Sequence, residues 1–195
     1  MKKKSLFIGG TVFLVLILLL VTSYNSLIKK EEKVNQDWSE VQNTYQRRLD
    51  LIPNLVSVVK GVSEFEKNVL QKVAETRSRA SGVLSEKEIN SENYYRQKQL
   101  QDSLAASVNR LIVLIEAYPE LQATKSYLAL QKQLVGTERR ITVARKDFNE
   151  SVFEYNRTVK KFPSNLTAGL FGFKQRQGFT SDTGAEHAVE IKFVK

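Results

Sequence analysis

The residues of this chain that could do chemistry are mostly charged side chains placed on apolar stripes. Glu66, Glu138 and Arg145 each fall where a helical repeat of three and four residues otherwise carries apolar side chains. Because an unpaired buried charge is costly, we expect these groups to be paired across helices in a structural ion network. The alternative is a carboxylate metal or catalytic site, which would need further ligands.

Those further ligands are scarce in the sequence. The chain has no cysteine, and its only histidine is His187, near the C-terminus. Zinc and non-haem iron sites draw mainly on histidine and cysteine, and di-iron sites in helix bundles use Glu-x-x-His motifs. A serine–histidine–aspartate arrangement is disfavoured for the same reason, and no glycine-rich loop opens a helix. We therefore predict no enzyme, no catalytic residue, no metal site and no cofactor.

An uncharged apolar segment, "LFIGGTVFLVLILLLV", lies near the N-terminus at Leu6–Val21. The 20 residues Ser5–Tyr24 would span roughly 30 Å as a helix, which matches the core of a bilayer. A cleaved signal peptide is the alternative, but its apolar region is typically only about 7–15 residues long. We predict that residues 1–24 are an N-terminal tail and an uncleaved span, which makes this a single-pass protein of the bacterial inner membrane.

The distribution of lysines leaves the side of the membrane open. Three lysines precede the apolar segment, and Lys29, Lys30 and Lys33 follow it. Positive residues next to a span set its orientation, whereas acidic residues contribute little. The counts tie, so both orientations stay open.

Apolar residues recur at helical spacing over most of the remaining chain. The pattern divides into four segments: Tyr24–Leu49, Pro53–Ala80, Ser85–Ala117 and Glu120–Phe162. Such a series of segments suits an up-and-down arrangement with coiled-coil-like packing. We predict an all-α protein in which residues 25–163 form an antiparallel four-helix bundle after the single transmembrane helix.

Pro53 raises the question of how the first two segments are joined. The apolar phase continues across the proline, which favours one kinked helix. A single helix of more than fifty residues would, however, leave much of its stripe uncovered. Asp50 could cap a new helix with Pro53 in its first turn, where proline is tolerated. We therefore predict a tight turn at "LDLIP", at the end of the bundle farthest from the membrane.

Composition changes after Pro163, and glycine becomes frequent. For residues 164–195 we predict a non-helical, partly disordered tail. Alternation at Val189, Ile191 and Phe193 weakly indicates a short strand. Within the fourth segment, Gly136 should lower the stability of the helix by about 1 kcal/mol relative to alanine. We interpret a glycine at this position as permitting a close approach between helices.

Four separated stretches, in this order, resemble the LemA family. They are "RRLDLIPNLV" at 47–56, "EAYPELQA" at 116–123, "LQKQLVGTERRITVARKDFNESVFEYN" at 130–156 and "FPSNLTAGLFGF" at 162–173. The resemblance implies a membrane helix followed by a soluble four-helix bundle, with no established enzymatic activity. It also implies a bacterial envelope protein, with one relative that acts in magnetosome membranes. The family is usually drawn with its short N-terminus outside the cell, an orientation that the lysine count here does not support.

The motif positions are the candidate interaction residues. We interpret Arg47 and Arg48 first as a solvated pair near a helix end, where the helix dipole alone favours cations. A contact with a partner or a phosphate is the alternative. The full set of candidates is Arg47, Arg48, Asp50, Pro53, Asn54, Glu116, Tyr118 and Pro119.

The function we predict is that of a membrane-anchored, non-catalytic scaffold or interaction module. Its partners would be unidentified proteins of the envelope or membrane, and self-association into a homo-oligomer stays open. The alternative is peripheral binding of lipid or nucleic acid by a basic surface, since the formal net charge is +9. Acidic residues are interspersed among the basic ones, as in "KKEEK", so we expect no nucleic acid partner.

Overall fold

The computed structural model describes residues 2–60, 67–84 and 91–179, and the regular structure in these ranges is entirely helical. The helices are α1 (Lys2–Val59), α2 (Lys67–Leu84), α3 (Ser91–Ile115), α4 (Pro119–Gln122), α5 (Lys125–Lys160) and α6 (Ser164–Phe171). The all-α fold class is therefore confirmed for these ranges. Glu66 and the short strand expected around Ile191 lie outside the described residues.

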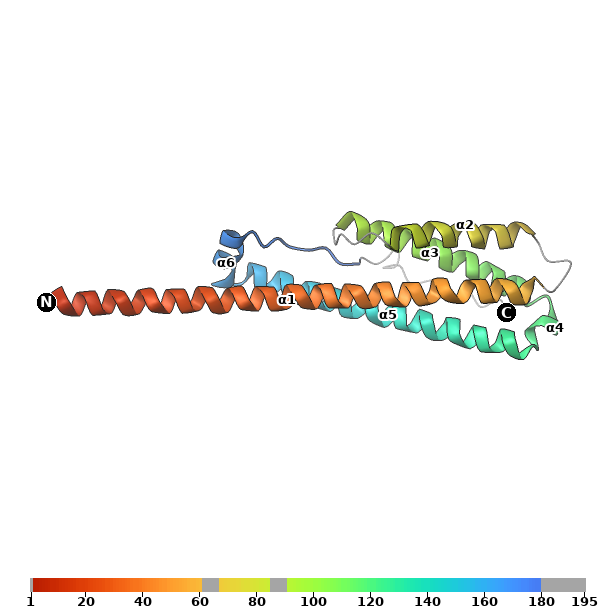
Figure 1. Ribbon diagram of the computed structural model, residues 1–195, viewed down its shortest axis with the longest axis horizontal. Helices are drawn as coiled ribbons and strands as arrows, with labels where there is room; N and C mark the ends of the chain where they lie inside the picture. Colours follow the sequence, from red (N-terminus) through yellow and green to blue (C-terminus); the bar gives the residue numbers. More distant parts are fainter. Residues whose placement is uncertain (1, 61–66, 85–90, 180–195) are drawn as a thin grey trace, which may run out of the picture.

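Helix α1 combines the apolar segment and the first body segment in one element of 58 residues. Its N-terminal part extends beyond every other element in Figure 1, and all side chains in Phe7–Val21 are exposed to solvent. Within the part of the chain that the structure describes, α1 is the one helix long and apolar enough to cross a membrane, with a mean hydropathy of 2.3 in its apolar window. The helix continues past Tyr24 without a break, so the proposed span and the body share one rigid element.

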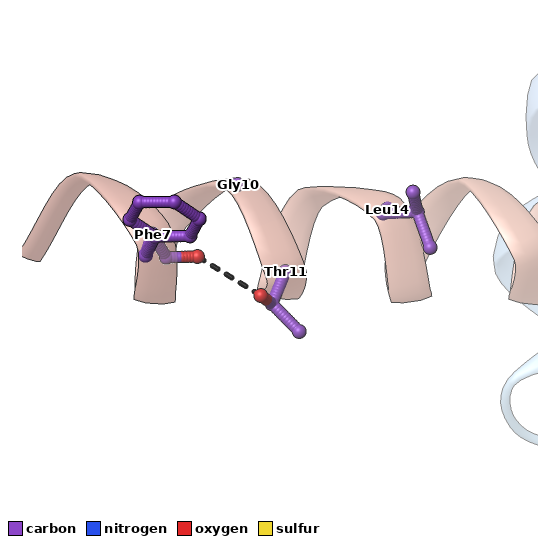
Figure 2. A pocket seen from close by; sticks show the side chains of 4 residues that line it. All are labelled: Phe7, Gly10, Thr11 and Leu14. Carbon is purple, nitrogen blue, oxygen red and sulfur yellow. Dashed lines mark hydrogen bonds between the residues drawn. The ribbon is translucent and has the colours of Figure 1, made fainter. Parts of the chain in front are cut away.

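The polar residue near the start of this segment is satisfied by its own helix. The Thr11 hydroxyl donates to the Phe7 carbonyl oxygen at 2.9 Å, as Figure 2 shows next to Gly10 and Leu14. A threonine hydroxyl bonded in this way needs no water and no partner helix. Thr11 is therefore compatible with an apolar surrounding.

The expected turn at Pro53 is wrong, because α1 runs through this proline to Val59. A proline inside a helix has no N–H, so the carbonyl oxygen of Leu49, four residues earlier, loses its helical donor. The Arg77 Nε of α2 donates to this same Leu49 oxygen at 3.0 Å. A side chain from another helix thus replaces the missing backbone hydrogen bond, which removes part of the cost of an internal proline.

A single long α1 is stable because α5 covers the stripe that it would otherwise expose. Helix α5 is 36 residues long and lies antiparallel to α1 along the whole body (Figure 1). The stripe residues of α1 are accordingly buried, as the helical spacing predicts: Leu27, Val34, Trp38, Val41, Tyr45, Leu49 and Ile52. Helix α5 begins at an N-cap, where the Tyr127 N–H donates to the Thr124 hydroxyl at 3.2 Å.

Helices α2 and α3 form a shorter hairpin that covers only the part of α1 away from the N-terminus (Figure 1). Two buried clusters result. One lies between α1, α2, α3 and α5 around Leu55 and Leu111, and the other lies between α1 and α5 around Trp38 and Phe148. The second cluster has no α2 residue at its centre, and Tyr94 of α3 and the C-terminal segment help to cover it.

The expectation of a non-helical tail is wrong for Ser164–Phe171, which form α6. This helix ends at Gly172, whose φ of 77° is the left-handed conformation that glycine adopts at little cost. The Phe173 N–H then donates to the Ala168 carbonyl oxygen at 2.9 Å and closes the helix end. Residues 173–179, which we call the strap, follow without regular structure.

Candidate interaction surfaces

Arg48 is buried in the middle of the body rather than solvated at a helix end. Its side chain is 3% exposed. Its Nη1 donates to the backbone oxygen of Gln101 at 3.0 Å and to the side-chain oxygen of Gln101 at 3.1 Å, and its Nη2 is bonded to the Glu138 carboxylate. The first interpretation of Arg48 is therefore wrong. The guanidinium joins α1 to both α3 and α5, because its fork of donors can serve several acceptors at once.

Arg145 forms a second set of polar contacts between the same three helices. Its Nε donates to the Tyr45 hydroxyl at 2.8 Å, and its Nη2 donates to the Asp102 carboxylate at 2.8 Å. Glu138 and Arg145 thus contact different partners and are not paired with each other. Lys98 also pairs with Asp102 at 3.0 Å.

The surroundings of Asp102 and Tyr45 shift the pKa values of these two groups in opposite directions. Burial alone would raise the pKa of Asp102, but the hydrogen bonds and charges of Arg145 and Lys98 outweigh it and hold that pKa below its usual value. Burial of the Tyr45 phenol raises its pKa, and this effect exceeds the opposing charge of Arg145. At neutral pH the site is therefore a carboxylate, a guanidinium and a neutral phenol, an arrangement suited to holding helices together.

The remaining motif residues lie mostly at the surface. Arg47, Pro53 and Asn54 are exposed, and Asp50 is exposed and accepts a hydrogen bond from Gln46 at 2.7 Å. At the far end of the body, Glu116 and Pro119 are exposed and Tyr118 packs partly against the core. The structure therefore gives both motifs exposed residues.

The strap is held by two asparagines of α5 that the sequence analysis did not single out. Asn156 donates to the Arg176 carbonyl oxygen at 2.7 Å and accepts from the Arg176 N–H at 2.9 Å. Asn149 makes the same pair of bonds with Phe179, at 3.0 and 2.7 Å. The signal was the seven-residue spacing of these asparagines, which places both on one face of α5.

Side chains of the strap add specific contacts to this backbone recognition. Arg176 donates to Glu31 at 2.8 Å and to Asn35 at 2.9 Å on α1. The Phe179 ring packs at an angle against Trp38 and Phe148, with ring centroids 5.9 and 5.5 Å away. The strap and Tyr94 of α3 thus cover the Trp38–Phe148 region of the α1–α5 pair together.

A shallow basic groove of about 630 Å³ runs along the outer face of α5 beside α1. Its cations include Arg47, and no acidic side chain lines it. Gly136 lies in this groove, and a Cβ atom there would meet no atom within 4 Å. The close approach expected at Gly136 therefore involves no other element within the described part of this chain. The other lining residues are Leu128, Gln131, Lys132, Gln133, Val135, Arg139 and Arg140.

The model of the LemA family matches residues 37–193. The chain belongs to the LemA family. Curated relatives of this LemA-family chain include magnetosome proteins MamQ 1 and MamQ 2 of Paramagnetospirillum magneticum, each 26% identical over 178 residues, covering 82% of this chain and 65% of the relative. Protein LemA of Metamycoplasma hominis is 23% identical over 144 residues, covering 74% of this chain and 63% of the relative. The chain thus spans less than two thirds of the length of these relatives.

The polar groups of this LemA-family chain divide into those that join helices and those that face solvent. In residues 2–60, 67–84 and 91–179, no group of three or more histidine, cysteine, aspartate or glutamate side chains is placed to hold a metal ion. Arg48 and Arg145 are engaged in holding helices together, whereas the basic groove and the exposed motif residues are open to solvent.

Proposed function

We propose that this LemA-family protein is a membrane-anchored, non-catalytic interaction module of the bacterial inner membrane. In this proposal α1, α2, α3 and α5 act as one antiparallel four-helix bundle, and residues 1–24 anchor it. The observation that supports it best is the continuity of α1, which carries the apolar segment and the core of the body in 58 residues. A helix without a joint holds the body at a fixed height and orientation relative to the membrane.

The basic groove is the surface that we propose for a protein partner. Its exposed apolar side chains, Leu128 and Val135, lie among the cations of Arg47, Arg139 and Arg140. Apolar anchors surrounded by charges of one sign suit an acidic segment with apolar residues of its own. The open space above Gly136 would let a partner helix approach α5 closely.

Photo-crosslinking in cells tests this proposal. A photoreactive amino acid in place of Val135 should trap one specific membrane or envelope protein, whereas the same residue in place of the exposed Ser78 on α2 should not. Only self-crosslinks or a random set of products at Val135 would contradict the proposal. Substitution of Arg139 and Arg140 by glutamate should remove the specific product, because the two glutamates would offset the remaining positive charges of Arg47 and Lys132.

A further inference from the structure

Helix α6 lies beside the point where α1 enters the body (Figure 1). The Phe171 ring at its C-terminal end packs against Tyr24 of α1, with ring centroids 4.8 Å apart, and the Phe173 ring also packs against Tyr24, at 5.8 Å. Tyr24 lies three residues after Val21, where the apolar segment ends, and precedes Leu27, the first fully buried residue of the body. Helix α6 is therefore fixed at the height of this junction.

The face of α6 that points away from the body carries two large apolar side chains. Leu166 is 61% exposed and Leu170 is 71% exposed, and their spacing of four residues places them on one side of the helix. Thr167 and Ala168 are buried on the side that faces the body. Just before α6, Phe162 adds a ring that is 73% exposed. So many large apolar side chains on one short segment indicate an interaction surface.

The position of the span indicates what covers this surface. A helical span from Ser5 to Tyr24 is roughly 30 Å long, so Tyr24 sits at the edge of the hydrocarbon core, where aromatic residues concentrate. Because Phe171 touches Tyr24, it lies at the same depth. Exposed lysines next to α6, Lys160, Lys161 and Lys174, match the negative charge of lipid headgroups.

We propose that α6, together with Phe162, is an interfacial helix that binds the lipid surface around α1. Leu166 and Leu170 enter the boundary between headgroups and acyl chains, as the apolar face of an interfacial helix does. Helix α6 also packs on α1 and α5, so its contact with lipid fixes the tilt of the body on the membrane. This inference rests on the proposed membrane anchoring and adds a second membrane contact to it.

The chain has no cysteine, which allows a direct measurement of depth in the full-length protein. Single variants Leu166→Cys and Leu170→Cys carry a nitroxide spin label in lipid nanodiscs. Collision with oxygen, which concentrates in lipid, is compared with collision with a water-soluble nickel complex. We expect both labels to lie about 5–10 Å within the boundary region, the depth typical of interfacial helices.

Three controls calibrate the experiment. Val15→Cys in the apolar segment should report lipid, and Val135→Cys in the basic groove should report water. On α6 itself, Asn165→Cys should be more accessible to the nickel complex than Leu166→Cys, because an interfacial helix has one face in lipid. Circular dichroism of each labelled variant confirms that the helix content is unchanged.

The outcomes separate this inference from the proposed anchoring. If Val15 reports lipid while Leu166 and Leu170 are as water-accessible as Val135, the interfacial helix is ruled out and the anchoring stands. If Val15 also reports water, the anchoring itself fails, and the inference fails with it. Magnetic broadening of the Leu170 label that disappears on dilution with unlabelled chain would place a second copy on α6 and would overturn the assignment to lipid.

Discussion

Arg48 shows how one side chain can connect three helices. Its guanidinium is nearly inaccessible to water, whereas its partner Glu138 is 48% exposed, so water reaches only one end of the pair. The Gln101 oxygens supply the acceptors on the inner side. A buried cation that keeps several acceptors specifies how the helices meet, even where the pair itself adds little net stability.

Removing the carboxylate should therefore destabilise the body. We expect Glu138→Ala to lower the free energy of unfolding by about 2 kcal/mol, because Arg48 stays buried and loses its counter-charge. Arg145→Ala should cost a similar amount, since the Tyr45 hydroxyl and Asp102 lose a shared donor. Urea denaturation of the full chain in detergent measures both.

Glu150→Ala, an exposed change on the same helix, is the control and should stay within about 0.5 kcal/mol of wild type. Near-wild-type stability of all three variants would exclude a structural role for these pairs.

The pKa of Asp102 predicts how stability depends on pH. Because its pKa is lowered in the folded state, the unfolded chain binds the proton more readily. The stabilisation by Asp102 is thus complete above its unfolded pKa of about 3.9 and is lost as pH falls through the lower folded value. The carboxylate is 39% exposed, so we expect no more than about 1 kcal/mol. Thermal denaturation should show a difference between wild type and Asp102→Asn that shrinks as pH is lowered from 7 to 3, and a constant difference would contradict the assignment.

At the scale of elements, Pro53 creates a point within the continuous helix α1 where α2 can bind. The proline frees the Leu49 carbonyl oxygen, and Arg77 of α2 binds it. The α2–α3 hairpin is thereby attached to α1 through a backbone group that an ordinary helix would have used itself. This gives the "LDLIP" stretch a structural role at the seam between the two helix pairs.

A double-mutant cycle tests this coupling between Pro53 and Arg77. Arg77→Ala should lower the free energy of unfolding by about 1–2 kcal/mol, because the Leu49 oxygen loses its donor. In a Pro53→Ala background the same change should cost clearly less, since the alanine that replaces the proline supplies a backbone N–H to Leu49. Arg79→Ala, an exposed change on α2, is the matched control. Equal costs of Arg77→Ala in both backgrounds would show that the two residues act independently.

The strap is the second element whose docking can be tested. Each of the two asparagines binds the backbone of one strap residue. Asn156→Ala should therefore release Arg176, and Asn149→Ala should release Phe179. The loss of about 1 kcal/mol of hydrogen bonding should speed exchange of the corresponding amide proton roughly fivefold. Hydrogen exchange followed by NMR measures each amide separately, with Asn43→Ala on α1 as the control. Unchanged protection of both amides would mean that the rest of the strap holds them.

Gly178 adds a steric condition to this docking. A Cβ atom at this position would lie 2.5 Å from the Asn149 side-chain oxygen. That oxygen is already bonded to the Phe179 N–H, so it has little freedom to move. A glycine is therefore what allows the strap to approach α5 so closely.

At the scale of the whole molecule, α1 determines the shape. The other helices pack along α1 from about Tyr24 onward, and the apolar part before it extends alone from the body (Figure 1). An uncovered apolar helix of this length is stable in lipid, where its backbone groups are satisfied internally. The elongated form is thus explained if the membrane supplies the cover that no element within residues 2–60, 67–84 and 91–179 gives.

Charges placed in the middle of the apolar segment should abolish this anchoring. Each arginine at the centre of a span costs about 2.5–3.5 kcal/mol on the insertion scale, so Leu16→Arg with Leu19→Arg should prevent stable integration. Alkaline carbonate extraction of membranes should release this variant and leave wild type in the pellet. Leu128→Arg, an exposed leucine of the body, should behave as wild type. Retention of the double variant would show that the chain is held by something other than this span.

The sequence by itself determined the helical character, the apolar segment and the stripe of α1 that faces inward. These features follow from hydrophobic periodicity and local composition, which act over a few turns of a single helix. The tertiary structure decided what the special residues do. The Leu49 oxygen that Pro53 leaves without a donor is bound by Arg77, 28 residues along the chain from Leu49. The buried guanidinium of Arg48 finds an acceptor in Gln101, 53 residues away. Such partners depend on which helix faces meet, and the periodicity of a single stretch carries no information about the element that will supply the missing donor or acceptor.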